Sequence, residues 1–196
     1  HLACLAAGVD SRSTGLTSAM TFVASANAMA YCGADVRLCD IDINTLNISP
    51  SSLKDALAAH PDTKVIIPVH FAGLAANSAA IREIAGKRII IEDGAHALGA
   101  NYSFGHPVGC GEYADMTVFS FHPVKPITTG EGGAIVTNDP NLARRLKSLR
   151  THGIENDVER FENTGAAFED NQRCPWYYEQ QYLGFNYRMT DIQAAL

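Results

Sequence analysis

Lys125 lies in the segment SFHPVKPITTGEGG, residues 120–133, and is the side chain of this sequence best suited to covalent chemistry. It follows an alternating, partly aromatic stretch at 117–122, which predicts a buried strand. Pro123 and Pro126 flank the lysine, fix the local φ angles and remove backbone donors, so this segment cannot be a helix interior. An amine held on a stiff turn at the end of a core strand is partly desolvated and becomes a usable nucleophile and base. Taken alone, Lys125 also fits a surface lysine in a proline-rich turn.

Other polar side chains follow predicted strands in the same way. Asp93 and His96 come after the apolar run 89–91, and Ser120 stands at the end of the strand that precedes Lys125. Because functional groups gather at the carboxyl ends of strands in α/β sheets, we expect these side chains to lie together. A lysine that forms a Schiff base and an aspartate that keeps a pyridine nitrogen protonated are the groups that pyridoxal phosphate needs. Singly, Asp93 also fits a helix N-cap, Ser120 a core hydroxyl and His96 a buried, hydrogen-bonded histidine.

The elements that must position these groups alternate along the chain. Apolar runs that are continuous rather than alternating, such as 65–67 and 89–91, are typical of strands covered on both faces. This order predicts a three-layer α/β/α domain with a mostly parallel sheet. The predicted strands are 36–40, 65–71, 88–92, 117–122 and 134–137, and the predicted helices are 2–7, 23–32, 51–59, 78–85, 142–149 and one that opens near 190.

Composition narrows the class of function. The chain has 196 residues, 46% of them hydrophobic, and a formal net charge of −6, so we expect no nucleic-acid partner and no membrane surface. No apolar run approaches the roughly 20 residues of a bilayer span. The five cysteines are odd in number and never spaced as CxxC, which favours reduced thiols and a cytoplasmic protein. The seven histidines lack metal-ligand spacing, so metal chemistry is not indicated.

Six segments, in order, resemble the DegT/DnrJ/EryC1/StrS sugar nucleotide aminotransferases. The resemblance covers nearly the whole chain and implies a fold-type I, pyridoxal phosphate-dependent transferase large domain. The segments 121–133 and 175–191 look most like the family members that make UDP-4-amino-4,6-dideoxy-N-acetyl-β-L-altrosamine in pseudaminic acid biosynthesis. The matching segments are 21–28 (TFVASANA), 39–42 (CDID), 67–73 (IPVHFAG), 91–100 (IEDGAHALGA), 120–133 (SFHPVKPITTGEGG) and 183–195 (LGFNYRMTDIQAA).

The resemblance implies a role for each matched residue. Lys125 is expected to bind the cofactor aldehyde and to move the proton during catalysis. Asp93 is expected to pair with the pyridine nitrogen, and Phe22 to stack on one face of the ring. His96 is expected near the ring oxygen, and Ser120 on the cofactor phosphate.

The resemblance also implies partners. Asn186, with Arg188 beside it, is expected to reach the cofactor phosphate of a second subunit, so we expect a homodimer with shared active sites. The substrates implied are an amino-acid donor, L-glutamate, and a UDP-linked 4-keto-6-deoxy-N-acetylhexosamine that receives the amino group at C4. The polar stretch 155–182 is too long for an ordinary connection and is expected to be a substrate or dimer loop.

The resemblance is incomplete at the start of the chain. The family's phosphate-binding Ser-Gly-Thr segment and its small C-terminal domain lie outside these residues, so we expect 1–196 to be a partial large domain. The residues DSRSTG at 10–15 depart from the family's pattern at a segment that leads into a strand, so the resemblance does not support that strand here. Two alternatives stay open: a 4-keto-sugar dehydratase of the same fold, although such relatives carry histidine at the Lys125 position, and a catalytically inert fragment or cofactor-binding relative.

Overall fold

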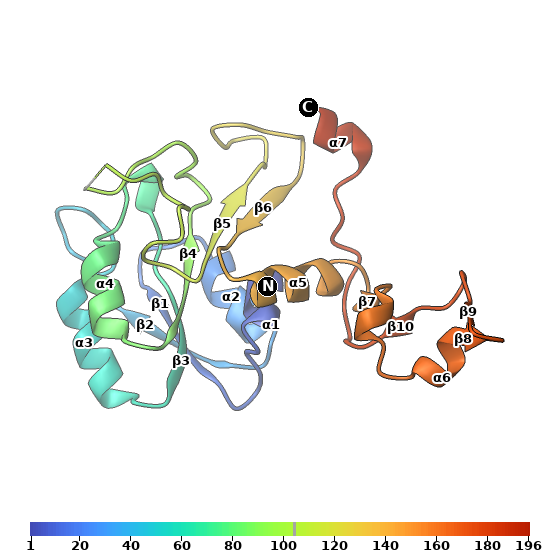
Figure 1. The fold of residues 1–196 in the computed structure, drawn as a ribbon. Helices are drawn as coiled ribbons and strands as arrows, with labels where there is room; N and C mark the ends of the chain where they lie inside the picture. The colour runs from blue at the N-terminus through green and yellow to red at the C-terminus, as the bar shows by residue number, and fades with distance from the viewer. Residues whose placement is uncertain (104) are drawn as a thin grey trace. The chain divides into compact units, whose positions relative to one another are not determined.

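A six-stranded sheet organises the computed structural model, which describes residues 1–103 and 105–196 (Figure 1). The strand order is β2-β1-β3-β4-β5-β6. All neighbouring pairs from β2 through β5 are parallel, and only β6 is antiparallel to its neighbour, which confirms the predicted mostly parallel sheet. The strands are β1 (Thr14–Ser18), β2 (Asp35–Cys39), β3 (Thr63–Ile67), β4 (Ile89–Asp93), β5 (Met116–Ser120) and β6 (Gly133–Val136).

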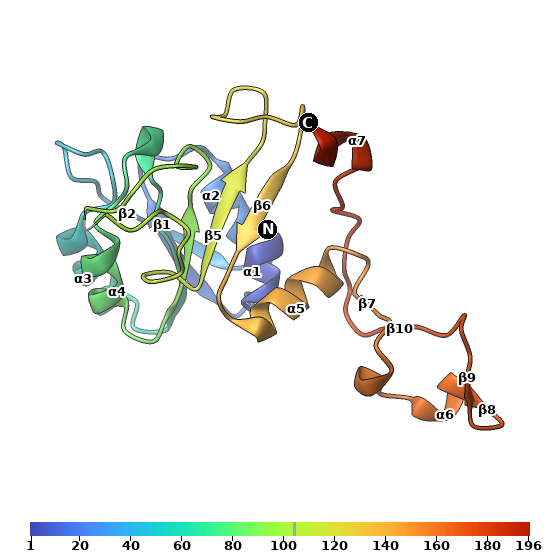
Figure 2. The same cartoon turned by 45° about the horizontal axis from the view of Figure 1, so that its top comes forward.

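Helices cover both faces of this sheet. On one face, α3 (Pro50–Ala59) and α4 (Ser78–Ala85) lie side by side, and their leucine and isoleucine side chains form a buried cluster with Leu16, Ile66 and Ile90 of the sheet (Figures 1 and 2). Successive side chains of a strand point to opposite faces. Gly15, which precedes Leu16 in β1, accordingly lies against Met29 of α2 (Ala24–Ala30) on the other face. Helix α1 (Leu2–Ala6) contacts α2, so the predicted three layers are present.

The two helices of the first face begin at side-chain caps. Ser49 Oγ accepts a hydrogen bond from the Ser52 amide, and Pro50 occupies the first turn of α3, where a missing N–H is harmless. The Asn77 side chain accepts from the Ala80 amide at the start of α4, and Gly86 ends that helix at a φ of 61°. These signals explain why the predicted range 78–85 matches α4.

The strand that the departure at 10–15 left unsupported is present as β1. Strand β1 is fully buried and lies between β2 and β3 in the sheet. Its sequence, TGLTS, has a single aliphatic residue, so a search for apolar runs passes over it. The polar groups are accommodated internally: Thr17 Oγ1 donates to the carbonyl oxygen of Ile67 at 2.8 Å, and the missing side chain of Gly15 leaves room for Met29.

Two predicted strands extend too far. Strand β3 stops at Ile67 because Pro68 has no amide proton for the ladder, and residues 71–73 form the 3-10 turn η1 (Phe71–Gly73). Strand β5 ends at Ser120, so His122 lies in the following loop. Both strands therefore end before the residue at which the sequence analysis predicted their end.

Residues 144–188 form a compact unit of their own, entered through α5 (Pro140–Leu149). Its short elements are joined by side-chain hydrogen bonds, such as those that the Glu179 carboxylate accepts from the amides of Glu162 and Asn163. The remaining residues, including α7 (Asp191–Ala195) with its Thr190–Gln193 capping box, belong to the unit of the sheet. The short elements are β7 (Ile154–Glu155), η2 (Val158–Arg160), α6 (Thr164–Ala167), β8 (Phe168–Glu169), β9 (Gln172–Arg173) and β10 (Glu179–Gln180).

Among the described residues, no helix combines the length and the apolar character that a membrane crossing requires.

Candidate active site

The predicted site residues follow the carboxyl ends of the parallel strands. Asp93 is the last residue of β4, and Ser120 is the last residue of β5. Phe22 lies between the end of β1 and the start of α2. The Gly94 amide donates to the carbonyl oxygen of Val118 at 2.9 Å, which keeps the two strand ends in register as the chain leaves β4. The topology therefore brings these residues to one edge of the sheet, as the sequence predicted.

Lys125 is carried by the loop between β5 and β6, and backbone hydrogen bonds close that loop. The Phe121 amide donates to the carbonyl oxygen of Gly132 at 2.8 Å, and the Thr129 amide donates back to that of Phe121 at 3.1 Å. Within the loop, the Lys125 amide donates to the carbonyl oxygen of His122 at 2.9 Å. The half-buried lysine is therefore set on a defined turn at the strand end and is not part of a helix.

The Lys125 amine meets the imidazole of His96. Nζ of the lysine lies 2.6 Å from Nε2 of the histidine, a hydrogen-bond distance. A charged amine has no lone pair, so in that state Lys125 donates and the histidine nitrogen accepts. His96 is exposed, which removes the alternative that it is a buried structural histidine. The structure thus brings together two groups that the chain separates by 29 residues.

Both oxygens of the Asp93 carboxylate are hydrogen-bonded. Ser25 Oγ donates to Oδ2 at 2.6 Å, and the Ala95 amide donates to Oδ1 at 3.1 Å. No helix begins after Asp93, so it is not a helix N-cap. Sequence reasoning missed Ser25, although it lies inside the TFVASANA segment, because its contact with Asp93 spans 68 residues. The hydrogen bonds hold the half-buried carboxylate at the strand end.

Phe22 and Ser120 present different groups at this edge. The Phe22 ring is 78% exposed, which is unusual for an aromatic side chain and fits a ring that stacks on a planar ligand. Ser120 is half-buried, and its Oγ accepts a long hydrogen bond, 3.3 Å, from the His122 amide. As the acceptor in this bond, the hydroxyl can direct its own proton to a ligand such as a phosphate.

Asn186 and Arg188 belong to the unit 144–188. Both are exposed, and the backbone of Asn186 forms an isolated antiparallel bridge with Thr151. The Tyr187 amide donates to the carbonyl oxygen of Arg150 at 3.0 Å, which fixes the same segment. Their role on the phosphate of a second subunit stays a prediction.

A buried carboxylate lies on the other face of β4 and belongs to the core. Glu92 is fully buried, and it accepts hydrogen bonds from Ser78 Oγ at 2.7 Å, Tyr102 Oη at 2.6 Å and Thr117 Oγ1 at 2.8 Å. These donors come from α4, from the chain after β4, and from β5. The network therefore joins three segments directly behind Asp93, and sequence analysis gave Glu92 no role.

Sequence spacing did not suggest a second group of side chains. His106, Cys110 and Glu112 each offer one possible metal-ligand atom, and these atoms lie within 4.8 Å of one another. Such ligands suit zinc, but the histidine and the glutamate are exposed and contact each other directly. The group belongs to the chain between β4 and β5, and we assign it no part in the site.

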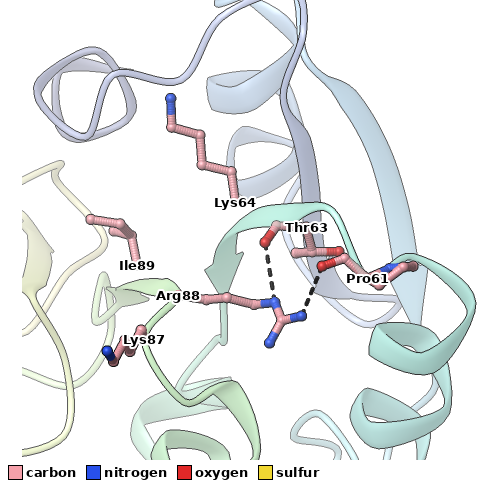
Figure 3. A pocket seen from close by; sticks show the side chains of 6 residues that line it. All are labelled: Pro61, Thr63, Lys64, Lys87, Arg88 and Ile89. Atoms are coloured by element: carbon pink, nitrogen blue, oxygen red, sulfur yellow. Dashed lines mark hydrogen bonds between the residues drawn. The ribbon is translucent and has the colours of Figure 1, made fainter.

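An open pocket of about 420 Å³ lies at the opposite, amino ends of β3 and β4 (Figure 3). Figure 3 shows the Arg88 guanidinium bound to the carbonyl oxygens of Thr63 and Pro61, at 3.1 and 2.9 Å. The arginine thus joins the two strands where they start. Because Asp93 and Lys125 follow the carboxyl ends, this pocket is separate from the candidate active site.

The groups at the carboxyl edge fit pyridoxal phosphate. The Lys125 amine can bind an aldehyde, the Asp93 carboxylate can pair with a protonated ring nitrogen, and the exposed Phe22 ring can cover a flat heterocycle. When bound, this cofactor supplies an electron sink that stabilises negative charge on a substrate carbon. The chain's own contribution is to hold these groups at fixed strand ends.

Comparison with known proteins agrees with this arrangement. The model of the DegT/DnrJ/EryC1/StrS aminotransferase family matches residues 1–196. Among curated relatives, the GDP-perosamine synthase of Caulobacter vibrioides is 38% identical over 198 residues, covering 100% of this chain and 47% of the relative. The uncharacterized protein MJ1066 of Methanocaldococcus jannaschii is 38% identical over 199 residues, covering 100% and 48%. The chain spans about half the length of the curated relatives it matches.

Solved structures show the same fold. Helicobacter pylori PseC, an aminotransferase involved in the biosynthesis of pseudoaminic acid, superposes with a TM-score of 0.80 at 31% identity, covering 99% of this chain and 48% of PseC. DesV of S. venezuelae gives a TM-score of 0.81 at 30% identity, covering 99% and 46%. The fold is that of the fold-type I pyridoxal phosphate-dependent transferases, and aminotransferases of this family use that cofactor. With a family match along its whole length and a site that fits the cofactor, the chain belongs to the DegT/DnrJ/EryC1/StrS aminotransferase family.

Proposed function

We propose that the whole protein is a pyridoxal phosphate-dependent aminotransferase that transfers an amino group from L-glutamate to C4 of a UDP-linked 4-keto-6-deoxy-N-acetylhexosamine. The observation that carries this proposal is the 2.6 Å contact between Lys125 Nζ and His96 Nε2, at the edge where Asp93 ends β4. An amine next to an imidazole can hold and move a proton, and transamination requires a proton transfer at the substrate carbon.

The substrate class rests on the relatives. PseC is named for the biosynthesis of pseudoaminic acid, and the Caulobacter relative is named a GDP-perosamine synthase. Both names concern amino sugars, which supports a sugar nucleotide as the amino acceptor. Within that class, the segments 121–133 and 175–191 favour the UDP-linked N-acetylhexosamine.

The partner subunit is part of the proposal. Asn186 lies on an exposed, backbone-fixed segment, and we assign it to the cofactor phosphate of a second copy in a homodimer. Residues 155–182 carry exposed aromatic side chains, Trp176 and Tyr178 among them, which suit contacts with a sugar nucleotide or with the second subunit. Crosslinking and the oligomeric mass of the whole protein test this assignment.

A 4-keto-sugar dehydratase of the same fold is the second candidate. The resembling dehydratases carry histidine where this chain has Lys125, and the structure places a lysine amine at that position. The two activities differ in their use of the donor. Transamination consumes one glutamate and releases one 2-oxoglutarate per amino sugar, whereas dehydration alone releases none.

The test uses the whole protein with pyridoxal phosphate. Borohydride reduction and peptide mass mapping should locate the cofactor on Lys125, and Lys125→Ala should abolish this attachment. Incubation with glutamate and a panel of UDP- and dTDP-linked 4-keto sugars should give 2-oxoglutarate and a 4-amino sugar, identified by mass spectrometry. Cofactor attachment at a different lysine would contradict the site, and sugar turnover without 2-oxoglutarate would favour the dehydratase.

A further inference from the structure

Ser25 of helix α2 and Asp93 of strand β4 are joined by a short hydrogen bond. Ser25 Oγ lies 2.6 Å from Oδ2 of Asp93, and the serine is 4% exposed. Hydrogen bonds to an ionised acceptor are short and about twice as strong as neutral ones. The second oxygen, Oδ1, accepts from the Ala95 amide. The carboxylate is thus fixed by one donor at each oxygen, from two different parts of the chain.

A second hydroxyl extends this contact. Thr21 Oγ1 lies 2.6 Å from Ser25 Oγ, and 3.1 Å from the carbonyl oxygen of Phe22. A hydroxyl has one proton to donate, and Ser25 gives its proton to the carboxylate. If Ser25 donates to Asp93, Thr21 must be the donor in the 2.6 Å contact, and its single proton then leaves the longer contact with the Phe22 carbonyl oxygen. In that arrangement the hydroxyl of Thr21 supports that of Ser25, which donates to Asp93.

The geometry leaves Asp93 free to bind a further donor. Each carboxylate oxygen has two lone-pair sites, so Oδ1 and Oδ2 both keep acceptor capacity after Ala95 and Ser25 have bound. An aspartate at the end of a strand can rotate about two side-chain bonds, and donors on both oxygens restrict that rotation. The orientation of the carboxylate is set before any ligand arrives, which reduces the entropy lost on binding.

We propose that Ser25 is a positioning residue that holds the Asp93 carboxylate in the orientation required by the protonated ring nitrogen of pyridoxal phosphate, and that Thr21 supports it. This inference rests on the proposed function. It assigns a role to the hydroxyls of the TFVASANA segment, whose exposed Phe22 is expected to stack on the same ring. Ser25 touches neither cofactor nor substrate in this role and acts through Asp93 alone.

Ser78 provides a matched control. Like Ser25, it is 4% exposed and donates to a carboxylate of β4, but its acceptor is Glu92 on the opposite face, at 2.7 Å. Ser25→Ala removes one hydrogen-bond donor from Asp93, and Ser78→Ala removes one from Glu92. We therefore expect both variants to lower the free energy of unfolding. Only Ser25→Ala should change the behaviour of the cofactor.

The experiment measures pyridoxal phosphate binding to the apo form of the whole protein by fluorescence titration, together with kcat and KM. Ser25→Ala should raise the cofactor Kd about tenfold and lower kcat about tenfold, the scale of one charge-assisted hydrogen bond, with KM for the keto sugar unchanged. Ser25→Thr retains the hydroxyl and should return both values to within about twofold of the wild type. Ser78→Ala should lower the Tm and leave the cofactor Kd unchanged.

A double-mutant cycle identifies the route of the effect. In an Asp93→Asn background, Ser25→Ala should add little further loss of cofactor affinity, because the residue through which it acts is already changed. Equal losses for Ser25→Ala with and without Asp93 would overturn the inference, as would wild-type Kd and kcat in Ser25→Ala. A wild-type protein that binds pyridoxal phosphate nowhere would instead overturn the proposed function, and this inference with it.

Discussion

The hydroxyl of Tyr102 donates a 2.6 Å hydrogen bond to Oε2 of Glu92, the residue immediately before Asp93. Because adjacent residues of a strand point to opposite faces, β4 ends with one carboxylate in the core and the next in the site. Donors from α4 and the following loop fix the first carboxylate, and Ser25 of α2 fixes the second. Hydrogen bonds on both faces of the sheet therefore fix the carboxyl end of β4.

Tyr102→Phe should destabilise the protein by about 1–3 kcal/mol, because a buried carboxylate loses a donor that no water replaces. Urea unfolding, followed by circular dichroism, measures the change in the free energy of unfolding. The control is Tyr31→Phe, at a ring that is 69% exposed, which should change this free energy by less than about 0.5 kcal/mol. Equal stability of Tyr102→Phe and the wild type would show that the network does not stabilise the fold.

Acid should weaken the fold through Glu92. Burial by itself raises the pKa of this carboxyl, but the interaction with His70, 3.5 Å away, and the hydrogen bonds from Tyr102 and Ser78 outweigh it and lower the pKa. A lowered pKa in the folded state means that the carboxylate stabilises the protein fully above the unfolded pKa, about 4.3 for glutamate. That stabilisation is lost as the pH falls from there through the lower folded pKa.

The measurement is urea unfolding at a series of acidic pH values, with Glu92→Gln as the comparison. The variant should be less stable at neutral pH and should lose less stability on acidification than the wild type. An identical acid slope in both proteins would assign the acid sensitivity to other carboxyls.

His96→Ala should leave the cofactor attached to Lys125 but lower kcat. The variant removes the 2.6 Å partner of the lysine amine and leaves the Asp93 and Phe22 contacts in place. Loss of a group that assists proton transfer costs on the order of 10²-fold in rate. Borohydride trapping of the cofactor separates the two effects: a variant that fails to trap it has lost binding and not proton transfer.

Gly153→Ala should disrupt the unit formed by residues 144–188. Gly153 has a φ of 72°, and an added Cβ would overlap the backbone carbonyl of Tyr182, which cannot move as a side chain can. We expect a loss of at least about 2 kcal/mol from the left-handed conformation and the overlap together. Limited proteolysis should cut this variant within 144–188.

Gly165→Ala is the matched control for that unit. Its added Cβ would meet only an Asn163 oxygen at 3.7 Å, an ordinary contact, and its φ is not left-handed. Proteolysis of Gly165→Ala should match that of the wild type, and equal protection of both glycine variants would contradict the proposed overlap.

Local signals in the sequence predicted the elements that they encode directly. Helix α4 has an asparagine cap, an apolar face and a glycine end, and all three can be recognised without the fold. Lys125, Asp93 and Ser120 follow apolar strands, so the rule for strand ends placed them correctly at one edge. In these cases, residues close together in the sequence are enough to predict the element or the position of the side chain.

The parts that sequence analysis missed depend on distant contacts. Strand β1 is polar in composition, and its place in the sheet depends on backbone pairing with β2 and β3 and on the bond from Thr17 to Ile67. Ser25 acquires its role only when α2 packs on β4. The role proposed for Asn186 involves a second copy of the chain, whose contacts a single sequence does not describe.

The strand order has a consequence for how the protein matures. Strand β1 pairs with β3 through residues that lie 50 positions apart, Thr17 with Ile67, and contacts of such long range form slowly. Ser25 and Asp93 lie 68 residues apart, so an unfolded chain does not bring them together. A ligand that binds only the native chain stabilises it by mass action, and we expect added pyridoxal phosphate to raise the fraction of newly made protein that survives proteolysis.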